Sequence, residues 1–89
     1  MKLCMIGTGY VGLVSGVCFS DMGNIVYCVD KDQKKIERLN KGIVPIYEPG
    51  LSDLVKKNTK SKYLLFSNNI RKVKDANIIF IAVGTPSSR

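Results

Sequence analysis

The 89-residue chain contains no histidine and no tryptophan, and it has only three cysteines and three prolines. Without histidine and without a C-x-x-C pair, the sequence offers no common zinc site. Cys4, Cys18 and Cys28 each lie in an apolar segment, so we expect all three to be small buried side chains in a reducing compartment. None of them is predicted to be catalytic, because no neighbouring group would lower the thiol pKa.

The sequence also lacks an apolar run that approaches the roughly 20 residues needed to cross a bilayer. The most hydrophobic stretch, residues 78–83, has the length of a β-strand. Glycines interrupt the apolar N-terminus and no small-residue cleavage site follows it, which argues against a secretory signal. We therefore expect a cytoplasmic protein with no membrane partner.

Positive charge is in excess, with 14 Lys and Arg against 7 Asp and Glu and a net charge of +7. A basic run over residues 56–62 would suit a polyanion, or would simply be a solvated helix end. Because neither stacking aromatics nor a recognisable nucleic-acid module accompanies it, we expect no nucleic-acid partner. A dinucleotide or a sugar nucleotide is itself an anion and also fits this charge.

Strand-like and helix-like segments alternate along the chain. The expected strands are residues 2–6, 25–29, 63–66 and 78–83. The expected helices are residues 10–22 and 32–40, with shorter ones that begin near residues 51 and 70. This alternation predicts an α/β fold with a parallel sheet and right-handed crossovers.

The first helix carries apolar residues at spacings of three and four, which mark one face. They are Val11, Val14, Val17, Cys18 and Met22. We expect this face to pack on the sheet and the helix to end at Gly23-Asn24.

Residues 7–12 read Gly-Thr-Gly-Tyr-Val-Gly, a G-x-G-x-x-G pattern that is weak evidence by itself. Its context strengthens it, because it follows a predicted strand, opens a predicted helix and precedes an acidic residue, Asp30, by about 20 positions. Gly7 would permit the tight turn, Gly9 would let backbone N–H groups approach a pyrophosphate, and Gly12 would let helix and strand pack closely. The pattern predicts a dinucleotide-binding turn at the N-terminus of the helix.

Asp30 is placed to accept hydrogen bonds from the adenosine ribose hydroxyls, and its charge would repel the 2′-phosphate of NADP. NAD is therefore the favoured cofactor, although Lys31, Lys34 or Lys35 would soften this discrimination if one of them reached the ribose. In the alternative interpretation the glycines make only a tight turn and Asp30 caps the following helix.

Four ordered motifs together resemble the UDP-glucose and GDP-mannose dehydrogenase family along nearly the whole chain. They are Gly-Thr-Gly-Tyr-Val-Gly-Leu-Val-Ser-Gly from Gly7, the segment from Asp30 to Gly42, Pro-Ile-Tyr-Glu-Pro-Gly-Leu from Pro45, and Val-Gly-Thr-Pro from Val83. The form of the third motif is similar to the UDP-glucose branch of the family.

The resemblance implies a partial Rossmann fold, a doubly wound parallel sheet with four strands in the order 3-2-1-4. Residues 1–89 would be the N-terminal part of an NAD-binding domain, and the later strands, a central helix and a sugar-nucleotide domain would lie outside them. The intact enzyme, a homo-oligomer, would oxidise UDP-glucose to UDP-glucuronate with two NAD. Its cysteine nucleophile would fall beyond Arg89, so this chain alone would be inactive. The alternatives are a dehydrogenase for GDP-mannose or a UDP-N-acetylhexosamine, and a non-catalytic nucleotide-binding module.

The resemblance also places Val11, Asp30, Lys35 and Thr85 at positions that contact NAD. Each of these roles has a competing interpretation. Lys35 would be a solvated helix residue and Thr85 a turn former, while Tyr10 and Val11 would only pack. No catalytic residue and no metal ligand is expected in the chain. The complete set of candidate cofactor-binding residues is Gly7, Gly9, Tyr10, Val11, Gly12, Asp30, Lys35 and Thr85.

Overall fold

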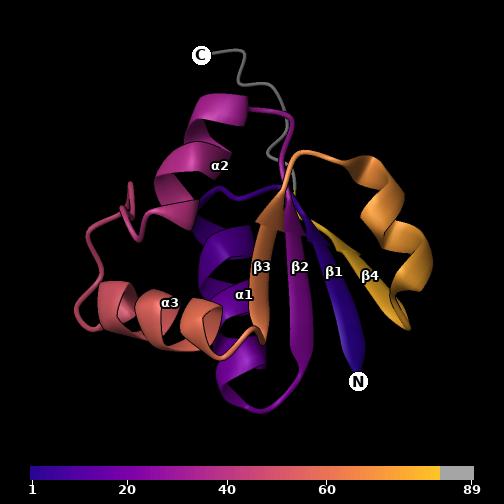
Figure 1. The fold of residues 1–89 in the computed structure, drawn as a ribbon, viewed down its shortest axis with the longest axis horizontal. Coiled ribbons are helices and arrows are strands. Elements are labelled where there is room, and N and C mark those ends of the chain that lie inside the picture. The colour runs from indigo at the N-terminus through magenta and orange to yellow at the C-terminus, as the bar shows by residue number, and fades with distance from the viewer. Residues whose placement is uncertain (83–89) are drawn as a thin grey trace.

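The computed structural model describes residues 1–82, which form one four-stranded parallel sheet with helical connections. The strands are β1 (Lys2–Ile6), β2 (Ile25–Val29), β3 (Leu64–Ser67) and β4 (Ile78–Ile81). Their order is β3-β2-β1-β4, as Figure 1 shows, and every neighbouring pair is parallel. Both the α/β class and the strand order predicted from the sequence are confirmed.

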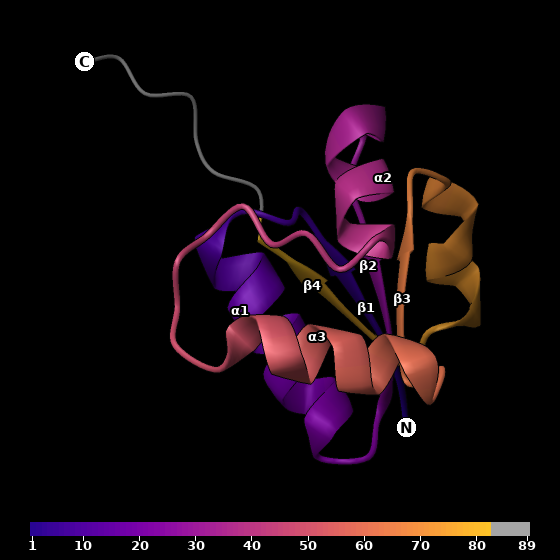
Figure 2. The same cartoon turned by 60° about the vertical axis from the view of Figure 1, so that its left-hand side comes forward.

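The helices are α1 (Tyr10–Asp21), α2 (Gln33–Asn40) and α3 (Leu51–Lys60), and a 3₁₀ helix, η1 (Ile70–Asp75), precedes β4. Figures 1 and 2 show α1 and α3 on one side of the sheet and η1 on the other. A parallel strand pair needs a crossover of this kind, because a tight hairpin cannot return the chain in the same direction.

The core lies between the sheet and the three α-helices. Alternate strand residues face it, as the two-residue period of a strand requires. From the sheet it contains Leu3, Met5, Val26, Cys28, Leu64 and Phe66. From the helices it contains Leu13, Val17, Ile36, Leu39, Leu51 and Val55. Phe80 of β4 adds a stacked ring pair with Phe19 of α1, at a centroid distance of 5.3 Å.

The inner face predicted for α1 is confirmed at Val14 and Val17, which pack in or against the core, but it is wrong at its other three positions. Val11, Cys18 and Met22 are exposed, and the face that packs on the sheet combines apolar side chains with glycine and serine. The buried positions of α1 are Gly12, Leu13, Gly16, Val17 and Ser20. The helix lies so close to the sheet that a Cβ added at Gly16 would lie 2.7 Å from the Cys28 sulfur. Close packing therefore requires glycine at this position, while Leu13 and Val17 of the same face pack in the core.

The three cysteines do not share one environment. Cys4 and Cys28 are buried, as predicted, whereas Cys18 is exposed on the outer face of α1, so the expectation of three buried thiols is wrong there. Burial raises the pKa of the Cys4 thiol. Burial, and after it repulsion from the thiolate that Cys4 would form at high pH, raises the pKa of Cys28 to about 12. Both buried groups are therefore neutral thiols near pH 7.

The strand register brings the carboxyl ends of β1 and β2 level. Ile6, the last residue of β1, pairs with Val29 of β2 on one side and with Ile81 of β4 on the other. The glycine turn after β1 and Asp30 after β2 consequently emerge next to each other at one edge of the sheet. Ligands of open parallel sheets bind at this carboxyl edge.

Candidate functional site

The glycine-rich turn leaves β1 and opens α1. Gly7 has a φ of +102°, a conformation that costs glycine little, and its N–H donates a 2.7 Å hydrogen bond to the carbonyl of Val29. Gly9 is the N-cap of α1, but no side chain caps the helix and no acidic residue lies in its first turn. The first N–H groups of α1 are thus left for an anion, and the helix dipole favours one there.

Gly9 and Gly12 differ in the space around them. A Cβ placed on Gly9 would meet nothing within 4 Å, so this side of the turn is open. A Cβ on Gly12 would lie 2.0 Å from the carbonyl oxygen of Gly7 and 3.3 Å from Ala82. Gly12 is therefore required where the helix crosses the turn, while Gly9 keeps the backbone accessible.

Thr8 joins the turn to the end of β2. Its hydroxyl donates a 2.6 Å hydrogen bond to Oδ2 of Asp30, and its backbone N–H donates to the same oxygen at 3.0 Å. Thr8 is only 1% exposed. The glycine pattern predicts no role for Thr8, so this contact was missed. The one available signal was a hydroxyl residue in the turn facing an acidic residue at the next strand end.

Asp30 sits in a network that fixes its carboxylate. Lys35 Nζ lies 3.7 Å from Oδ2, and the N–H of Asp32 donates to Oδ1 at 3.0 Å. Burial raises the pKa of Asp30, but hydrogen bonds from the Thr8 hydroxyl and from the N–H groups of Asp32 and Thr8 outweigh it. With the Lys35 ammonium they hold the pKa of Asp30 below its ordinary value. The carboxylate is ionised and oriented at neutral pH.

The helix cap after β2 is Asp32. Asp32 directly precedes α2, and its side chain accepts a 3.2 Å hydrogen bond from the N–H of Lys35. The alternative interpretation, in which Asp30 caps this helix, is therefore wrong. Because Asp32 satisfies the helix end, the carboxylate of Asp30 remains on the side of the glycine turn.

A cavity of about 560 Å³ lies at this edge of the sheet. Four of the candidate residues line it together, namely Gly7, Gly9, Asp30 and Lys35. Seven further residues complete the lining: Ile6, Thr8, Val29, Lys31, Asn68, Ile70 and Ala82. Asn68 and Ile70 come from the segment after β3, for which the sequence predicts a short helix near residue 70 but no binding role.

The other candidate residues lie elsewhere. Tyr10 and Val11 are 56% and 65% exposed and do not line the cavity, and Gly12 is buried beneath the turn. The hydroxyl of Tyr10 donates a 2.7 Å hydrogen bond to Glu48, and this bond with the charge of Glu48 raises the pKa of Tyr10. Thr85 lies outside the residues that the structure describes.

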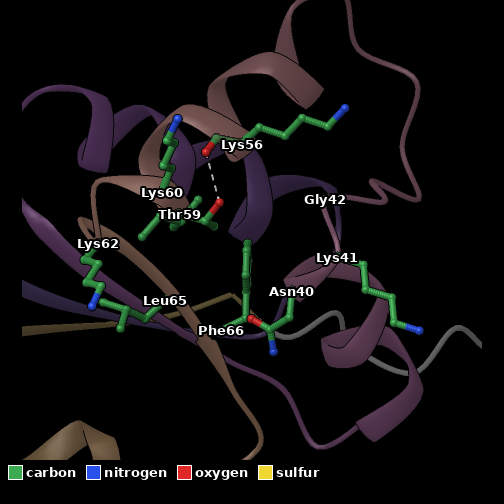
Figure 3. A pocket seen from close by; sticks show the side chains of 10 residues that line it. Asn40, Lys41, Gly42, Lys56, Thr59, Lys60, Lys62, Leu65 and Phe66 are labelled. Atoms are coloured by element: carbon green, nitrogen blue, oxygen red, sulfur yellow. Dashed lines mark hydrogen bonds between the residues drawn. The ribbon is translucent and has the colours of Figure 1, made fainter.

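A second cavity, of about 550 Å³, lies between the ends of α2 and α3 and the strand β3. Figure 3 shows four lysine side chains around it that point away from one another, Lys41, Lys56, Lys60 and Lys62. The single proton of the Thr59 hydroxyl is shared between the carbonyls of Val55, at 2.8 Å, and Lys56, at 3.1 Å, so it is not free to donate to a ligand. Lysines near helix C-termini interact favourably with the helix dipole. This basic cluster therefore has a structural explanation and presents no converging donors.

Within residues 1–82, no group of three or more His, Cys, Asp or Glu side chains is arranged to hold a metal ion. No helix in the same part of the chain is long and apolar enough to cross a membrane.

Comparison with protein families gives one match that spans the whole chain. The model of the NAD binding domain of the UDP-glucose/GDP-mannose dehydrogenase family matches residues 1–89.

Similar curated proteins carry related names. UDP-glucose 6-dehydrogenase TuaD of Bacillus subtilis is 55% identical over 89 residues, covering 99% of this chain and 19% of the relative. UDP-glucose 6-dehydrogenase of Rhizobium meliloti is 57% identical over 90 residues, covering 100% of this chain and 21% of the relative. The chain thus spans about a fifth of the length of these relatives.

Solved structures with the same fold are nucleotide-sugar dehydrogenases. A ternary complex of GDP-mannose dehydrogenase from Pseudomonas aeruginosa superposes with a TM-score of 0.93 at 38% identity, covering 100% of this chain and 21% of that one. A UDP-glucose dehydrogenase from Pyrobaculum islandicum gives a TM-score of 0.90 at 36% identity, with coverages of 98% and 20%.

Proposed function

Because this chain belongs to the UDP-glucose/GDP-mannose dehydrogenase family, as a part of its NAD-binding domain, we propose that the glycine turn and Asp30 hold the adenosine half of NAD. The observation that carries this proposal is the pairing of Thr8 with Asp30 at the cavity. Two hydrogen bonds fix a carboxylate beside the open N-terminus of α1. A ribose and a pyrophosphate need these two groups next to each other.

The free N–H groups at the start of α1 would bind the pyrophosphate, helped by the positive end of the helix dipole. Asp30 would accept hydrogen bonds from the ribose hydroxyls. Its Oδ1 receives one protein hydrogen bond, from Asp32, so a lone pair remains for a ligand. The same charge would disfavour the 2′-phosphate of NADP, while Lys35 offsets part of that repulsion. When bound, NAD would supply a hydride acceptor, and these residues would hold its adenosine half.

The whole protein is proposed to be a UDP-glucose 6-dehydrogenase that forms UDP-glucuronate with two NAD. Residues 1–89 would be the N-terminal part of its NAD-binding domain, in a cytoplasmic homo-oligomer. The identities of 55% and 57% to proteins with that name support this substrate. GDP-mannose remains the second candidate substrate, supported by the 38% identity to the Pseudomonas GDP-mannose dehydrogenase.

Calorimetric titration of this chain with NAD and with NADP tests the cofactor site. NAD should bind more tightly than NADP, and Asp30→Ala should weaken NAD binding and narrow the difference between the two cofactors. Asp75→Ala is the matched control, since it removes an exposed carboxylate that lies on η1 rather than at the cavity. Equal NAD affinities of the wild-type and Asp30→Ala chains would refute the assignment of Asp30.

A further inference from the structure

Tyr10 and Glu48 connect two segments that lie 38 residues apart. The Tyr10 hydroxyl donates a 2.7 Å hydrogen bond to Oε1 of Glu48. Tyr10 is the first residue of α1, immediately after the N-cap Gly9. Glu48 belongs to the loop of residues 43–50, which connects α2 to α3. The bond therefore ties this loop to the helix end that is proposed to bind the pyrophosphate.

The loop has few other polar attachments. At its start the N–H of Ile43 donates to the carbonyl of Arg38, and at its end the carbonyls of Glu48 and Gly50 accept from the N–H groups of the first turn of α3. Val44 and Ile46 pack against the core without fixing any polar group. Within residues 1–82, the Tyr10 hydroxyl makes the one side-chain hydrogen bond to this loop. The position of the Glu48 carboxylate thus depends on Tyr10.

This carboxylate is a potential competitor for the site. The N-terminus of α1 has free N–H groups and no acidic residue in its first turn, so any nearby carboxylate is attracted to it. Glu48 is hydrogen-bonded to the side chain of Tyr10, the first residue of that turn. Yet neither Tyr10 nor Glu48 lines the cavity beside Gly9 and Asp30. The hydrogen bond keeps an anion near the helix end but outside the site.

We propose that Tyr10 is a positioning residue for the cofactor: its hydroxyl holds the Glu48 carboxylate away from the first N–H groups of α1 and so leaves them free for pyrophosphate. This inference rests on the proposed NAD site. Loss of the hydroxyl releases Glu48, which then caps α1 and competes with the bound anion. Loss of the Glu48 charge removes the competitor, whether or not the hydroxyl is present.

Three variants and one control test whether the Tyr10 hydroxyl acts by restraining the Glu48 charge. NAD affinity measured by calorimetry should fall about two- to fivefold in Tyr10→Phe, the size expected for a charge at a helix end. It should stay at or above the wild-type value in Glu48→Gln, and it should return to that value in the double variant. Tyr47→Phe is the control, because Tyr47 lies on the same loop and is 93% exposed. Circular dichroism of each variant verifies that the fold is retained.

The double variant separates positioning from a purely structural link. If the hydrogen bond merely stabilised the loop, the double variant would bind NAD as weakly as Tyr10→Phe, and that result would overturn the inference. An unchanged affinity in Tyr10→Phe would also overturn it. The same series titrated with inorganic pyrophosphate keeps the two proposals apart. If Asp30→Ala leaves NAD affinity unchanged, the ribose assignment is wrong. If Tyr10→Phe leaves pyrophosphate affinity unchanged, the role of Tyr10 is wrong.

Discussion

The Thr8 hydroxyl donates a 2.6 Å hydrogen bond to Asp30, across 22 residues of sequence. This bond links the glycine turn after β1 to the end of β2, the two places that a dinucleotide site must bring together. Because the carboxylate is already oriented, less conformational freedom has to be lost when a ligand binds. Thr8 is consequently as much a part of the site as the glycines around it.

Replacement of Thr8 by Val should lower both stability and NAD affinity. The methyl group keeps the shape, but Asp30 loses a charge-assisted hydrogen bond, which is worth about 1.5–3 kcal/mol in the free energy of unfolding. Urea denaturation measures the stability. Thr59→Val is the control, since the Thr59 hydroxyl bonds only to carbonyls of its own helix and its loss should change stability by less than about 0.5 kcal/mol. Equal stabilities of the Thr8→Val and Thr59→Val chains would contradict the role given to Thr8.

Alanine at Gly12 should lower stability, whereas alanine at Gly9 should lower NAD affinity alone. At Gly12 the new Cβ would lie 2.0 Å from a backbone oxygen that cannot move away, and we expect a loss of about 3 kcal/mol or more in stability. At Gly9 the Cβ meets nothing and φ is −72°, so stability should be retained. NAD affinity should nevertheless fall in Gly9→Ala, because the Cβ projects where the pyrophosphate approaches. Thermal unfolding and NAD titration of both variants measure these outcomes.

Asp30 should make the stability of the chain sensitive to acid. Its folded-state pKa lies below the ordinary value of 3.8, so its ionised form stabilises the folded state above that pH. The contribution decreases as the pH falls below the unfolded-state pKa and is gone below the folded-state pKa. The difference in free energy of unfolding between wild-type and Asp30→Asn chains should therefore be largest near neutral pH and shrink in acid. A difference that grows in acid would reverse the assigned sign.

The cysteines should react with a thiol reagent in two classes. Cys18 is exposed and should react rapidly in the folded chain, and Cys18→Ser should remove this fast phase. Cys4 and Cys28 are buried, with thiol pKa values raised by burial, so they should react only after unfolding in denaturant. Rapid reaction of the Cys18→Ser chain would show that the sheet opens more readily than the structure implies.

Much of the fold could be predicted from the sequence because each strand is a short apolar run that ends at a glycine or a polar residue. The strand of residues 2–6 was predicted with the bounds that the structure has, and so was the strand of residues 25–29. The positions of Gly7 and Asp30 were predicted for the same reason, since each follows a strand end directly. Local spacing carries this information without knowledge of distant contacts.

The inner face of α1 could be predicted only in part, at Val14 and Val17. Hydrophobic spacing favoured Val11 and Met22, yet the sheet lies so close that only glycine-sized residues fit at positions such as Gly16. Which face is buried depends on the distance between helix and sheet, and that distance is set by packing rather than by periodicity.

The sequence by itself determined the order of the strands, the glycine turn and the acidic residue after β2. Tertiary structure decided which other groups meet there. Thr8 reaches Asp30, and Tyr10 reaches Glu48, because the parallel register brings the carboxyl ends of the strands level and the loop of residues 43–50 returns to α1. Such contacts join residues 22 and 38 positions apart, and no local pattern specifies them.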